Sequence, residues 1–217
     1  MGEVDARQAP GAFERAMRSL LHPRRIAIVG ATPRPGFATS ILTGLVRCGY
    51  EGEIVPITPR YGEVHGLTAY PTLSAVPGGV DLAILVVPNH LVPEVLDDGE
   101  RAGVGAVNII TSGFGEKQED ESGASRQAAI GDFARRTGIR VVGPNCLGNI
   151  SVPAKMTASS GPYPVLRRGG IALALQSGLI AYSIVLPAND RGMGFTYMVT
   201  LGNEADVDVA DMIRYYA

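Results

Sequence analysis

Short runs of apolar residues alternate with longer, mixed segments along most of the chain. The apolar runs are rich in β-branched residues and cover Arg25–Val29, Glu53–Ile57, Asp81–Val87, Ala106–Ile110 and Arg140–Val142. The mixed segments are each long enough for three or four helical turns, and they cover Ala38–Cys48, Leu91–Ala102 and Gly123–Thr137. Strands that alternate with helices predict βαβ units and a parallel sheet.

Several of these runs are apolar at nearly every position, as in LAILVV and IAIV. A strand with this pattern is buried on both of its faces. An antiparallel sandwich would show alternating polarity and turns every 8 to 12 residues instead. The sequence therefore predicts an α/β fold, a Rossmann-like doubly wound parallel sheet with helices on both faces.

The rhythm of the pattern divides the chain into four parts. Residues 1–22 form an N-terminal extension with an amphipathic stretch at Phe13–Leu21, and residues 23–150 form the first domain. Residues 151–168 contain three prolines and no periodicity, which predicts a linker. The βαβ pattern restarts over residues 169–217, with strands at Gly170–Leu175 and Phe195–Thr200 and helices at Ser177–Arg191 and from Val207 onward. Two strands and two helices make a poor domain, so we expect an incomplete second domain.

Composition narrows the possible partners. Of the 217 residues, 46% are apolar and 18% are charged, which excludes a disordered chain. The net charge of −2 argues against nucleic acid or an anionic membrane as the main partner. The sequence has no run of 18 apolar residues and no signal-peptide pattern, so we expect no membrane span and a cytoplasmic protein. Cys48 and Cys146 make neither a disulfide framework nor a metal cluster.

A loop of candidate phosphate-binding residues follows the first strand. Gly30 ends that strand, and Thr32, Pro33, Arg34 and Pro35 follow before the next helix. Backbone N–H groups at such a junction suit a phosphate. The dinucleotide fingerprint G-x-G-x-x-G is not met, because Thr32 occupies the second glycine position. A tight turn without a ligand is the alternative.

The end of the second strand changes which cofactor is expected. An NAD site places an acidic residue there, but this strand is followed by Thr58, Pro59, Arg60 and Tyr61. A cation suits a ribose that carries a phosphate, as in NADP or coenzyme A. The alternative is that Arg60 is a solvated turn residue.

Further turn residues follow the other strands of the predicted sheet. They include Val87 and Pro88, then Thr111 and Ser112 after Ile110, and finally Asn145 and Cys146. Ligands of open parallel sheets bind outside the carboxyl ends of the strands, so these loops predict a cleft. Gln176, Ser177 and Gly178 form another strand-to-helix junction that suits an anion, with a simple N-cap as the alternative. His22, His65 and His90 are paired with no carboxylate or nucleophile by spacing, and we assign no catalytic or metal-binding residue.

The succession RRIAIVGATPRPG, ITPRYGEVHGLTAYPTL, VDLAILVVP, NIITSGFGE, GPNCLGNI, ALQSGLIAY and TLGNEADVD resembles the NDP-forming acyl-CoA synthetases, from about Pro23 to the end. This family includes relatives of the succinyl-CoA synthetase α subunit and of ADP-forming acetyl-CoA synthetase. The resemblance implies a CoA-binding Rossmann-like domain and then the start of a flavodoxin-like domain. It also implies the reaction of an acid, CoA and ATP to acyl-CoA, ADP and phosphate, through acyl phosphate and a phosphohistidine.

The resemblance also implies roles for residues, transferred motif by motif. Thr32 to Pro35 match the CoA loop, Arg60 or Tyr61 the basic CoA contact, and Ile110 to Ser112 the segment beside the pantetheine. Asn145 and Cys146 match positions near the thiol, Gln176 to Gly178 the phosphate-binding helix start, and Tyr182 a substrate-side position.

Two departures from the family pattern affect what this chain can do. Leu175 replaces a hydroxyl residue near the phosphate, and Ser112 stands where other members have an acid. None of the three histidines matches the phosphorylated one, so we expect residues 1–217 alone to be inactive. ATP, ADP and Mg²⁺ would bind through an ATP-grasp domain or β subunit, and an oligomer is expected. The alternatives are a non-catalytic CoA-binding module and an NADP-dependent oxidoreductase.

Overall fold

The computed structural model describes residues 5–9, 11–117 and 119–217. Its first sheet has five parallel strands in the order β2-β1-β5-β6-β7. These strands are β1 (Arg25–Val29), β2 (Glu53–Ile57), β5 (Leu82–Leu85), β6 (Ala106–Ile109) and β7 (Arg140–Val142). The strand order reverses between β1 and β5, so the sheet is doubly wound, as the sequence predicts.

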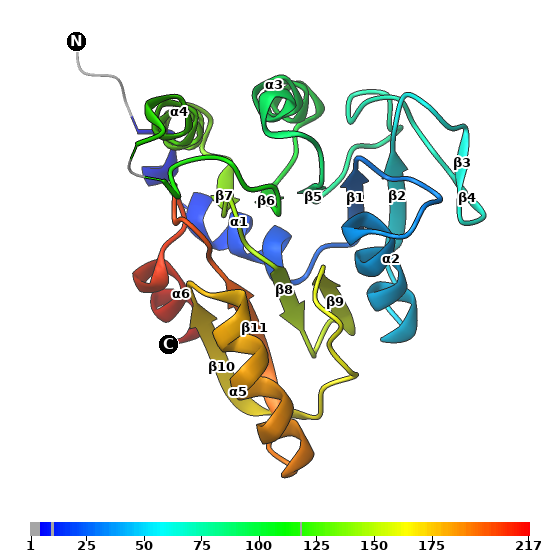
Figure 1. The fold of residues 1–217 in the computed structure, drawn as a ribbon, viewed down its shortest axis with the longest axis vertical. Helices are drawn as coiled ribbons and strands as arrows, with labels where there is room; N and C mark the ends of the chain where they lie inside the picture. Colours follow the sequence, from blue (N-terminus) through cyan, green and yellow to red (C-terminus); the bar gives the residue numbers. More distant parts are fainter. Residues whose placement is uncertain (1–4, 10, 118) are drawn as a thin grey trace.

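Helices cover both faces of this sheet (Figure 1). The helices α3 (Val92–Ala102) and α4 (Glu121–Thr137) pack on one face, and α1 (Ala12–Leu21) and α2 (Phe37–Arg47) pack on the other. Alternate strand residues divide between the faces. Ile26 and Ile28 join the core under α1 and α2, whereas Ala27 and Val29 join the core under α3 and α4. This division explains why the strands are apolar at every position.

A second, four-stranded sheet has the order β10-β11-β8-β9. Its parallel pair, β10 (Arg168–Leu175) and β11 (Phe195–Thr200), lies where the sequence predicts two strands. The pair β8 (Gly148–Ser151) and β9 (Met156–Ser159) forms an antiparallel hairpin that extends this sheet. The predicted linker over residues 151–168 thus contains the strand β9, which the sequence did not predict, and the sheet has four strands where two were expected.

The sequence analysis missed this hairpin because its strands are buried although half of their residues are polar. All eight residues of β8 and β9 are buried, although Asn149, Ser151, Thr157 and Ser159 are polar. A pattern of polar and small residues between prolines is typical of a loop, and here packing overrides it. A smaller hairpin, β3 (Glu63–Val64) and β4 (Leu67–Thr68), also lies in a turn-rich stretch.

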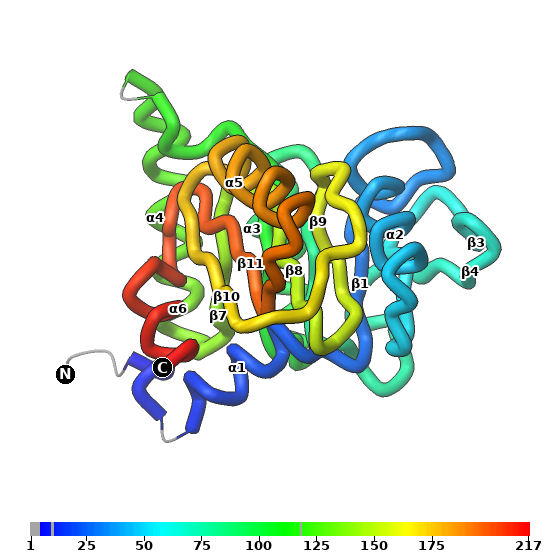
Figure 2. The backbone as a smooth tube through the Cα atoms, turned by 90° about the horizontal axis from the view of Figure 1, so that it is seen from below, coloured from blue at the N-terminus to red at the C-terminus, as the bar shows by residue number. Residues whose placement is uncertain are grey.

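The remaining helices complete the second half and join the two sheets. They are α5 (Gly178–Asp190) and α6 (Val209–Tyr216), with short 3₁₀ turns at Ala6–Gln8 and Asn89–Leu91. One buried cluster runs from α1, α2 and the first sheet to Met156 and Ala158 of β9 and to Val199 of β11. Figure 2 shows α6 beside α1 on one side and β9 beside α2 on the other. No helix of the described residues is long and apolar enough to cross a membrane.

A buried ion-pair network holds the loop after β11 against β7. The Asp206 carboxylate is fully buried and accepts hydrogen bonds from the Arg140 Nε (2.9 Å), the Val141 N–H (2.8 Å) and the Arg7 guanidinium (3.1 Å). Asp211 of α6 also pairs with Arg140. Burial disfavours the Arg140 cation, but the two carboxylates outweigh this effect and raise its pKa.

Asp206→Asn is expected to destabilise the fold by about 3 kcal/mol, because it leaves the buried Arg140 cation without one of its two anions. The midpoint of urea unfolding measures this change. Asp132→Asn is the matched control, since Asp132 pairs with Arg135 on the exposed surface, and we expect a loss below about 1 kcal/mol. Equal losses in the two variants would contradict this assignment.

The helix α2 approaches β9 closely at Gly44. A Cβ atom at Gly44 would lie 2.8 Å from the backbone oxygen of Thr157. At Gly99 of α3, another helical glycine, the nearest atom to such a Cβ would be a Leu73 methyl at 3.6 Å, which is an ordinary contact.

Gly44→Ala is therefore expected to destabilise the protein by about 1–3 kcal/mol, because α2 and β9 must move apart. Gly99→Ala should be neutral or stabilising by up to about 1 kcal/mol, since alanine is the better helix former and finds room there. Urea unfolding of both variants tests the pair. A stable Gly44→Ala protein would show that the contact between α2 and β9 can relax freely.

Candidate functional site

A cavity of about 750 Å³ lies where the strand-end loops of the two sheets meet. The first sheet contributes the residues that follow β5, β6 and β7, and the second sheet contributes those that follow β10 and β11. The lining residues are Phe37, Val86, Val87, Ile110, Thr111, Ser112, Asn145, Cys146, Leu147, Gln176, Ser177, Gly178, Leu179, Gly202 and Asn203.

Most of the predicted binding residues after β5 lie in this cavity. Val87, Ile110, Thr111, Ser112, Asn145 and Cys146 line it from the first half, and Gln176, Ser177 and Gly178 line it from the second. The sequence places these nine residues at strand ends, but it does not indicate that the two sheets face each other.

The other predicted residues lie outside the cavity lining. The loop from Thr32 to Pro35 is mostly exposed, and Arg60 is also exposed. The N–H groups of Gly30 and Ala31 both donate to the Ile57 oxygen, so the loops after β1 and β2 are neighbours. No carboxylate of the described residues forms an ion pair with Arg34 or Arg60.

Three of the predicted residues have surroundings of their own. Tyr61 is half-buried and packs at the edge of the first core cluster, and Pro88 is exposed at the start of a 3₁₀ turn. Tyr182 is half-buried and packs against the core of the second half, with its ring 5.4 Å from that of Tyr163 in an edge-to-face contact. Its predicted substrate-side role stays a prediction.

The start of α5 lines the cavity, and the first N–H groups of a helix have no partner within the helix. Ser177 caps the helix, since its hydroxyl accepts a hydrogen bond from the Ile180 N–H (3.3 Å). Gly178 lies so close to Leu147 that a Cβ atom there would collide with the leucine side chain. The N-terminus of α5, which is the positive end of the helix dipole, therefore lies directly beside the loop after β7.

A network of polar side chains joins the loops of the two halves. The Glu116 carboxylate accepts hydrogen bonds from the N–H groups of Gly113 (3.1 Å) and Phe114 (2.8 Å) and from the Asn203 amide (2.9 Å). The Asn203 side chain also donates to Gln127 (2.9 Å) and accepts from Asn145 (3.2 Å). The wall of the cavity therefore has a defined shape on this side.

Cys146 lies at the inner end of the cavity in a buried polar cluster. Its thiol donates to the Asn108 side-chain oxygen (3.0 Å), and the Asn108 amide donates to Asn149 (2.8 Å). The Asn149 amide in turn donates to the Leu20 oxygen (2.6 Å). Burial raises the pKa of the Cys146 thiol to about 12, so the residue is a neutral hydrogen-bonding group.

The histidines lie away from this cavity. The His22 ring contacts the Tyr197 hydroxyl at 2.7 Å, and burial lowers its pKa. His65 lies 3.4 Å from the Thr39 hydroxyl, and His90 is exposed. Over the described ranges, no three His, Cys, Asp or Glu side chains gather as a metal site would require. One oxygen of Glu204, beside Asn203, is buried without a hydrogen-bond partner among these residues.

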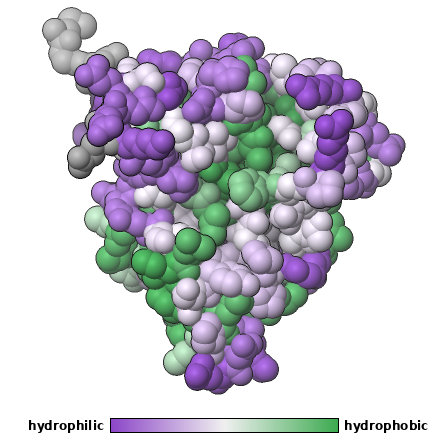
Figure 3. Space-filling view, in the orientation of Figure 1, coloured by the Kyte–Doolittle hydropathy of each residue, from purple (hydrophilic) through white to green (hydrophobic). Residues whose placement is uncertain are grey.

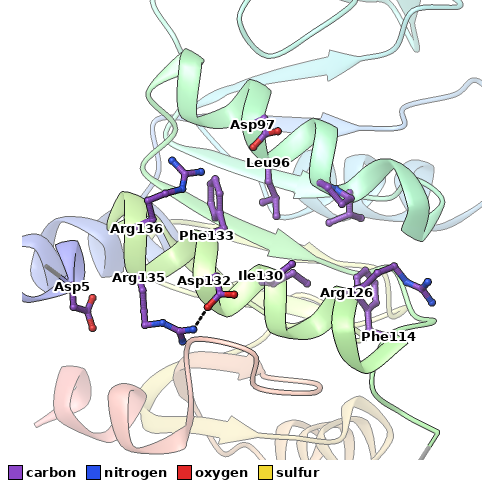
Figure 4. A pocket seen from close by; sticks show the side chains of 13 residues that line it. Asp5, Leu96, Asp97, Phe114, Arg126, Ile130, Asp132, Phe133, Arg135 and Arg136 are labelled. Atoms are coloured by element: carbon purple, nitrogen blue, oxygen red, sulfur yellow. Dashed lines mark hydrogen bonds and ion pairs between the residues drawn. The ribbon is translucent and has the colours of Figure 1, made fainter. Parts of the chain in front are cut away.

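A second groove, of about 410 Å³, lies between α3 and α4 (Figure 4). Its floor is apolar, with Leu96, Ile130 and Phe133. The arginines around it have local partners: Arg135 pairs with Asp132, and Arg136 pairs with Glu100 at 2.7 Å. None of the residues predicted for binding lines this groove.

Sequence reasoning missed six residues of the cavity lining, namely Phe37, Val86, Leu147, Leu179, Gly202 and Asn203. The motifs GPNCLG and GNEADVD contain Leu147, Gly202 and Asn203, so the motif matches pointed to their segments. Phe37 and Leu179 each lie in the first turn of a helix. A helical position of this kind carries no pattern that marks it as part of a site.

Comparisons with known proteins agree with this architecture. A family model described as a CoA binding domain matches residues 24–151, and a succinyl-CoA ligase like flavodoxin domain matches residues 168–217. The α subunit of an ADP-forming acetate–CoA ligase I from Pyrococcus furiosus is 35% identical over 206 residues, which are 93% of this chain and 44% of that protein. An ADP-forming 4-hydroxybutyrate–CoA ligase from Nitrosopumilus maritimus is 36% identical over 199 residues, 91% of this chain and 28% of the relative.

A solved structure has the same arrangement. The acetyl-coenzyme A synthetase 1 of Ca. Korarchaeum cryptofilum, solved in complex with phosphate and ADP, matches with a TM-score of 0.85 and 34% identity. The match covers 92% of this chain and 42% of that one. This chain thus spans less than half the length of these relatives.

The raised pKa of Cys146 predicts an unreactive thiol in spite of its place in the cavity. At pH 8 very little of such a thiol is thiolate, and the side chain is buried, so iodoacetamide should not alkylate it within hours. In Cys48→Ser, where Cys146 is the remaining cysteine, we expect mass spectrometry to show no adduct until urea unfolds the protein. The partly exposed Cys48 of the Cys146→Ser variant should react in the folded state. Rapid alkylation of folded Cys48→Ser would contradict the buried, protonated state of Cys146.

Proposed function

Because this chain belongs to the family of CoA-binding domains, we propose that it is the CoA-binding portion of an NDP-forming acyl-CoA synthetase. Such an enzyme converts an acid, CoA and ATP into acyl-CoA, ADP and phosphate. The observation that carries the proposal is the junction of two sheets at one cavity without charged lining residues, together with Arg34 and Arg60, which form no ion pair with any carboxylate of the described residues. The similar ADP-forming acid–CoA ligases support the same reaction class.

The proposed CoA site extends from the loops after β1 and β2 to the cavity. We assign the 3′-phosphate and pyrophosphate to Arg60 and Arg34, on the adjacent loops after β2 and β1. The pantetheine arm then follows the strand ends to the cavity, where Thr111, Ser112 and Asn145 offer neutral hydrogen bonds. CoA supplies the thiol that becomes the thioester.

The start of α5 suits the anion of the reaction. The N–H groups of Gly178 and Leu179 point out of the helix end and carry its positive partial charge. We assign them to the phosphate or the carboxylate that meets the thiol in the cavity. Cys146 holds its own proton, so it acts as a neutral neighbour and leaves the thiol of CoA as the nucleophile.

The remaining functions of the reaction belong to other parts of the enzyme in this proposal. ATP or ADP and Mg²⁺ would bind to an ATP-grasp portion, on a longer chain or on a β subunit. The Pyrococcus furiosus relative is named as a subunit α, which supports such a division. The phosphohistidine would also lie beyond this chain, because His22, His65 and His90 all lie outside the cavity lining.

Isothermal titration calorimetry of the 217-residue protein with CoA and dephospho-CoA tests the proposal. We expect CoA to bind more tightly by about 1.5–3 kcal/mol, which is roughly 10- to 150-fold. Arg60→Ala should remove most of this difference, because it removes the cation that pairs with the 3′-phosphate.

Arg101→Ala is the control for this measurement. Arg101 is an exposed arginine at the C-terminal end of α3. This end leads into the start of β6, so it lies near the amino ends of the strands, whereas the cavity lies at their carboxyl ends. Its loss should leave both affinities unchanged. Equal affinities of the wild-type protein for CoA and dephospho-CoA would refute the assignment of Arg60, and no binding of either ligand would refute the proposed function.

A further inference from the structure

The tip of the hairpin of β3 and β4 carries a histidine that the turn itself does not call for. His65 and Gly66 are the two residues between the strands, and their φ angles are both positive, at 52° and 80°. The sequence that best suits a two-residue turn of this kind is Asn-Gly or Asp-Gly. The backbone therefore accounts for Gly66 but leaves the choice of histidine at the tip to be explained.

The packing of this hairpin fixes where its tip lies. Val64 is buried in the core cluster of α1 and α2, whereas His65 is exposed. After the hairpin, the backbone of Tyr70 forms two hydrogen bonds to the last part of β2 and the residue that follows it. Arg60 lies on the short connection between β2 and the hairpin, so Arg60 and His65 belong to the same region at the carboxyl end of β2.

His65 also contacts the element that begins after the loop of β1. Its Nε2 atom lies 3.4 Å from the Thr39 hydroxyl, in the first turn of α2. The single proton of that hydroxyl points to the backbone oxygens of Arg34 (2.7 Å) and Thr32 (3.2 Å). Toward His65 the hydroxyl is therefore an acceptor, which places a proton on Nε2. The other ring nitrogen, Nδ1, has no hydrogen-bond partner among the residues that the structure describes.

The charged groups around His65 leave an excess of cations. Arg34 lies on the loop after β1, Arg60 and the half-buried Tyr61 precede the hairpin, and Glu63 lies on β3. Two cations thus accompany one carboxylate, and a proton on Nδ1 of His65 adds a third positive charge. Figure 3 shows hydrophilic residues at the upper right of the molecule, where Figure 1 has this loop and this hairpin. A phosphate group can therefore meet cations from two neighbouring loops.

We propose that His65 is a phosphate-binding residue of the CoA site and that it binds through a pH-dependent charge. Its Nδ1 atom takes up a proton from water and donates a hydrogen bond to a phosphate oxygen of CoA. The inference rests on the proposed function and adds a binding residue and a response to pH to the same site. Because the protonated ring binds the phosphate more tightly, its contribution to CoA affinity is present at low pH and is lost as the pH rises through the range in which imidazole titrates.

Calorimetry of the 217-residue protein with CoA at pH 6.5 and pH 8.0 tests this role. His65→Asn removes the imidazole and supplies a residue that suits the turn. We expect the wild-type protein to bind CoA about three- to tenfold more tightly than His65→Asn at pH 6.5, and about equally at pH 8.0. His65→Lys should exceed His65→Asn by a similar factor at both pH values, because an ammonium group keeps its charge throughout. Comparing proteins at one pH cancels the protonation of the ligand, whose terminal phosphate titrates near pH 6.

A second ligand and a control variant locate the effect. Dephospho-CoA identifies the phosphate: a gain at pH 6.5 that persists assigns His65 to the pyrophosphate, and a gain that disappears assigns it to the 3′-phosphate. His22→Asn is the matched control, because His22 ends α1 and contacts Tyr197, at the amino end of β1 and away from the proposed CoA site. This variant should bind CoA as the wild-type protein does at both pH values.

The outcomes separate this inference from the proposed function. If the wild-type protein and His65→Asn bind CoA with the same affinity at both pH values, the proposed function stands and the inference is wrong. If His65→Asn weakens CoA binding by the same factor at both pH values, the side chain shapes the loops without carrying a charge, and the inference is also wrong. If CoA binds to none of these proteins, the proposed function fails and takes the inference with it.

Discussion

The hydrogen bond between Asn108 and Asn149 is the constraint on which the arrangement of the two sheets depends. Asn108 lies within β6 of the first sheet and Asn149 within β8 of the second, and both side chains are fully buried. Neither amide can turn away without losing partners, because Asn108 also accepts from Cys146 and Asn149 also donates to Leu20. Unpaired amides in this core would cost about 1–3 kcal/mol each. Apolar packing alone could accommodate a small shift between the sheets, but this chain of bonds requires one position.

That fixed position allows loops distant in sequence to form one cavity. The strand ends of the first sheet and the start of α5 would otherwise be two separate, half-open edges. The hairpin of β8 and β9 connects them, because it follows β7 directly and pairs with β11. Gly44 lets α2 approach this hairpin, and Gly178 lets α5 approach Leu147. Glycines at these two contacts thus allow the halves to come near each other, and the polar network of Glu116 and Asn203 then joins their loops.

The sequence predicts the elements of this fold more reliably than their association. Strands buried on both faces have an unmistakable pattern, so β1, β2, β7 and β11 begin and end at the predicted residues. The hairpin of β8 and β9 was not predicted because its buried residues are polar. The side chains of Asn149 and Thr157 bond to Asn108, Leu20 and Cys48, which all lie more than 40 residues away in the sequence. For the same reason, nine of the predicted site residues could be placed at strand ends, while Phe37 and Leu179 became recognisable only when the two halves were brought together.

The motifs GPNCLG and GNEADVD contribute mainly contacts between the two halves of the structure. In GNEADVD, Asp206 binds Arg140 and Val141 while Asn203 binds Glu116, Gln127 and Asn145. In GPNCLG, Leu147 packs against Gly178 and Cys146 joins the cluster of Asn108. Every charged or strongly polar side chain named in this paragraph is engaged with another part of the protein, and none of the described residues that line the cavity is charged. In the proposed reaction this division would favour the helix start as the place of the anion, because no charged side chain of the described residues lines the cavity. The motifs therefore act mainly by holding the halves in place, and the backbone, hydroxyl and apolar groups that they position line the cavity between them.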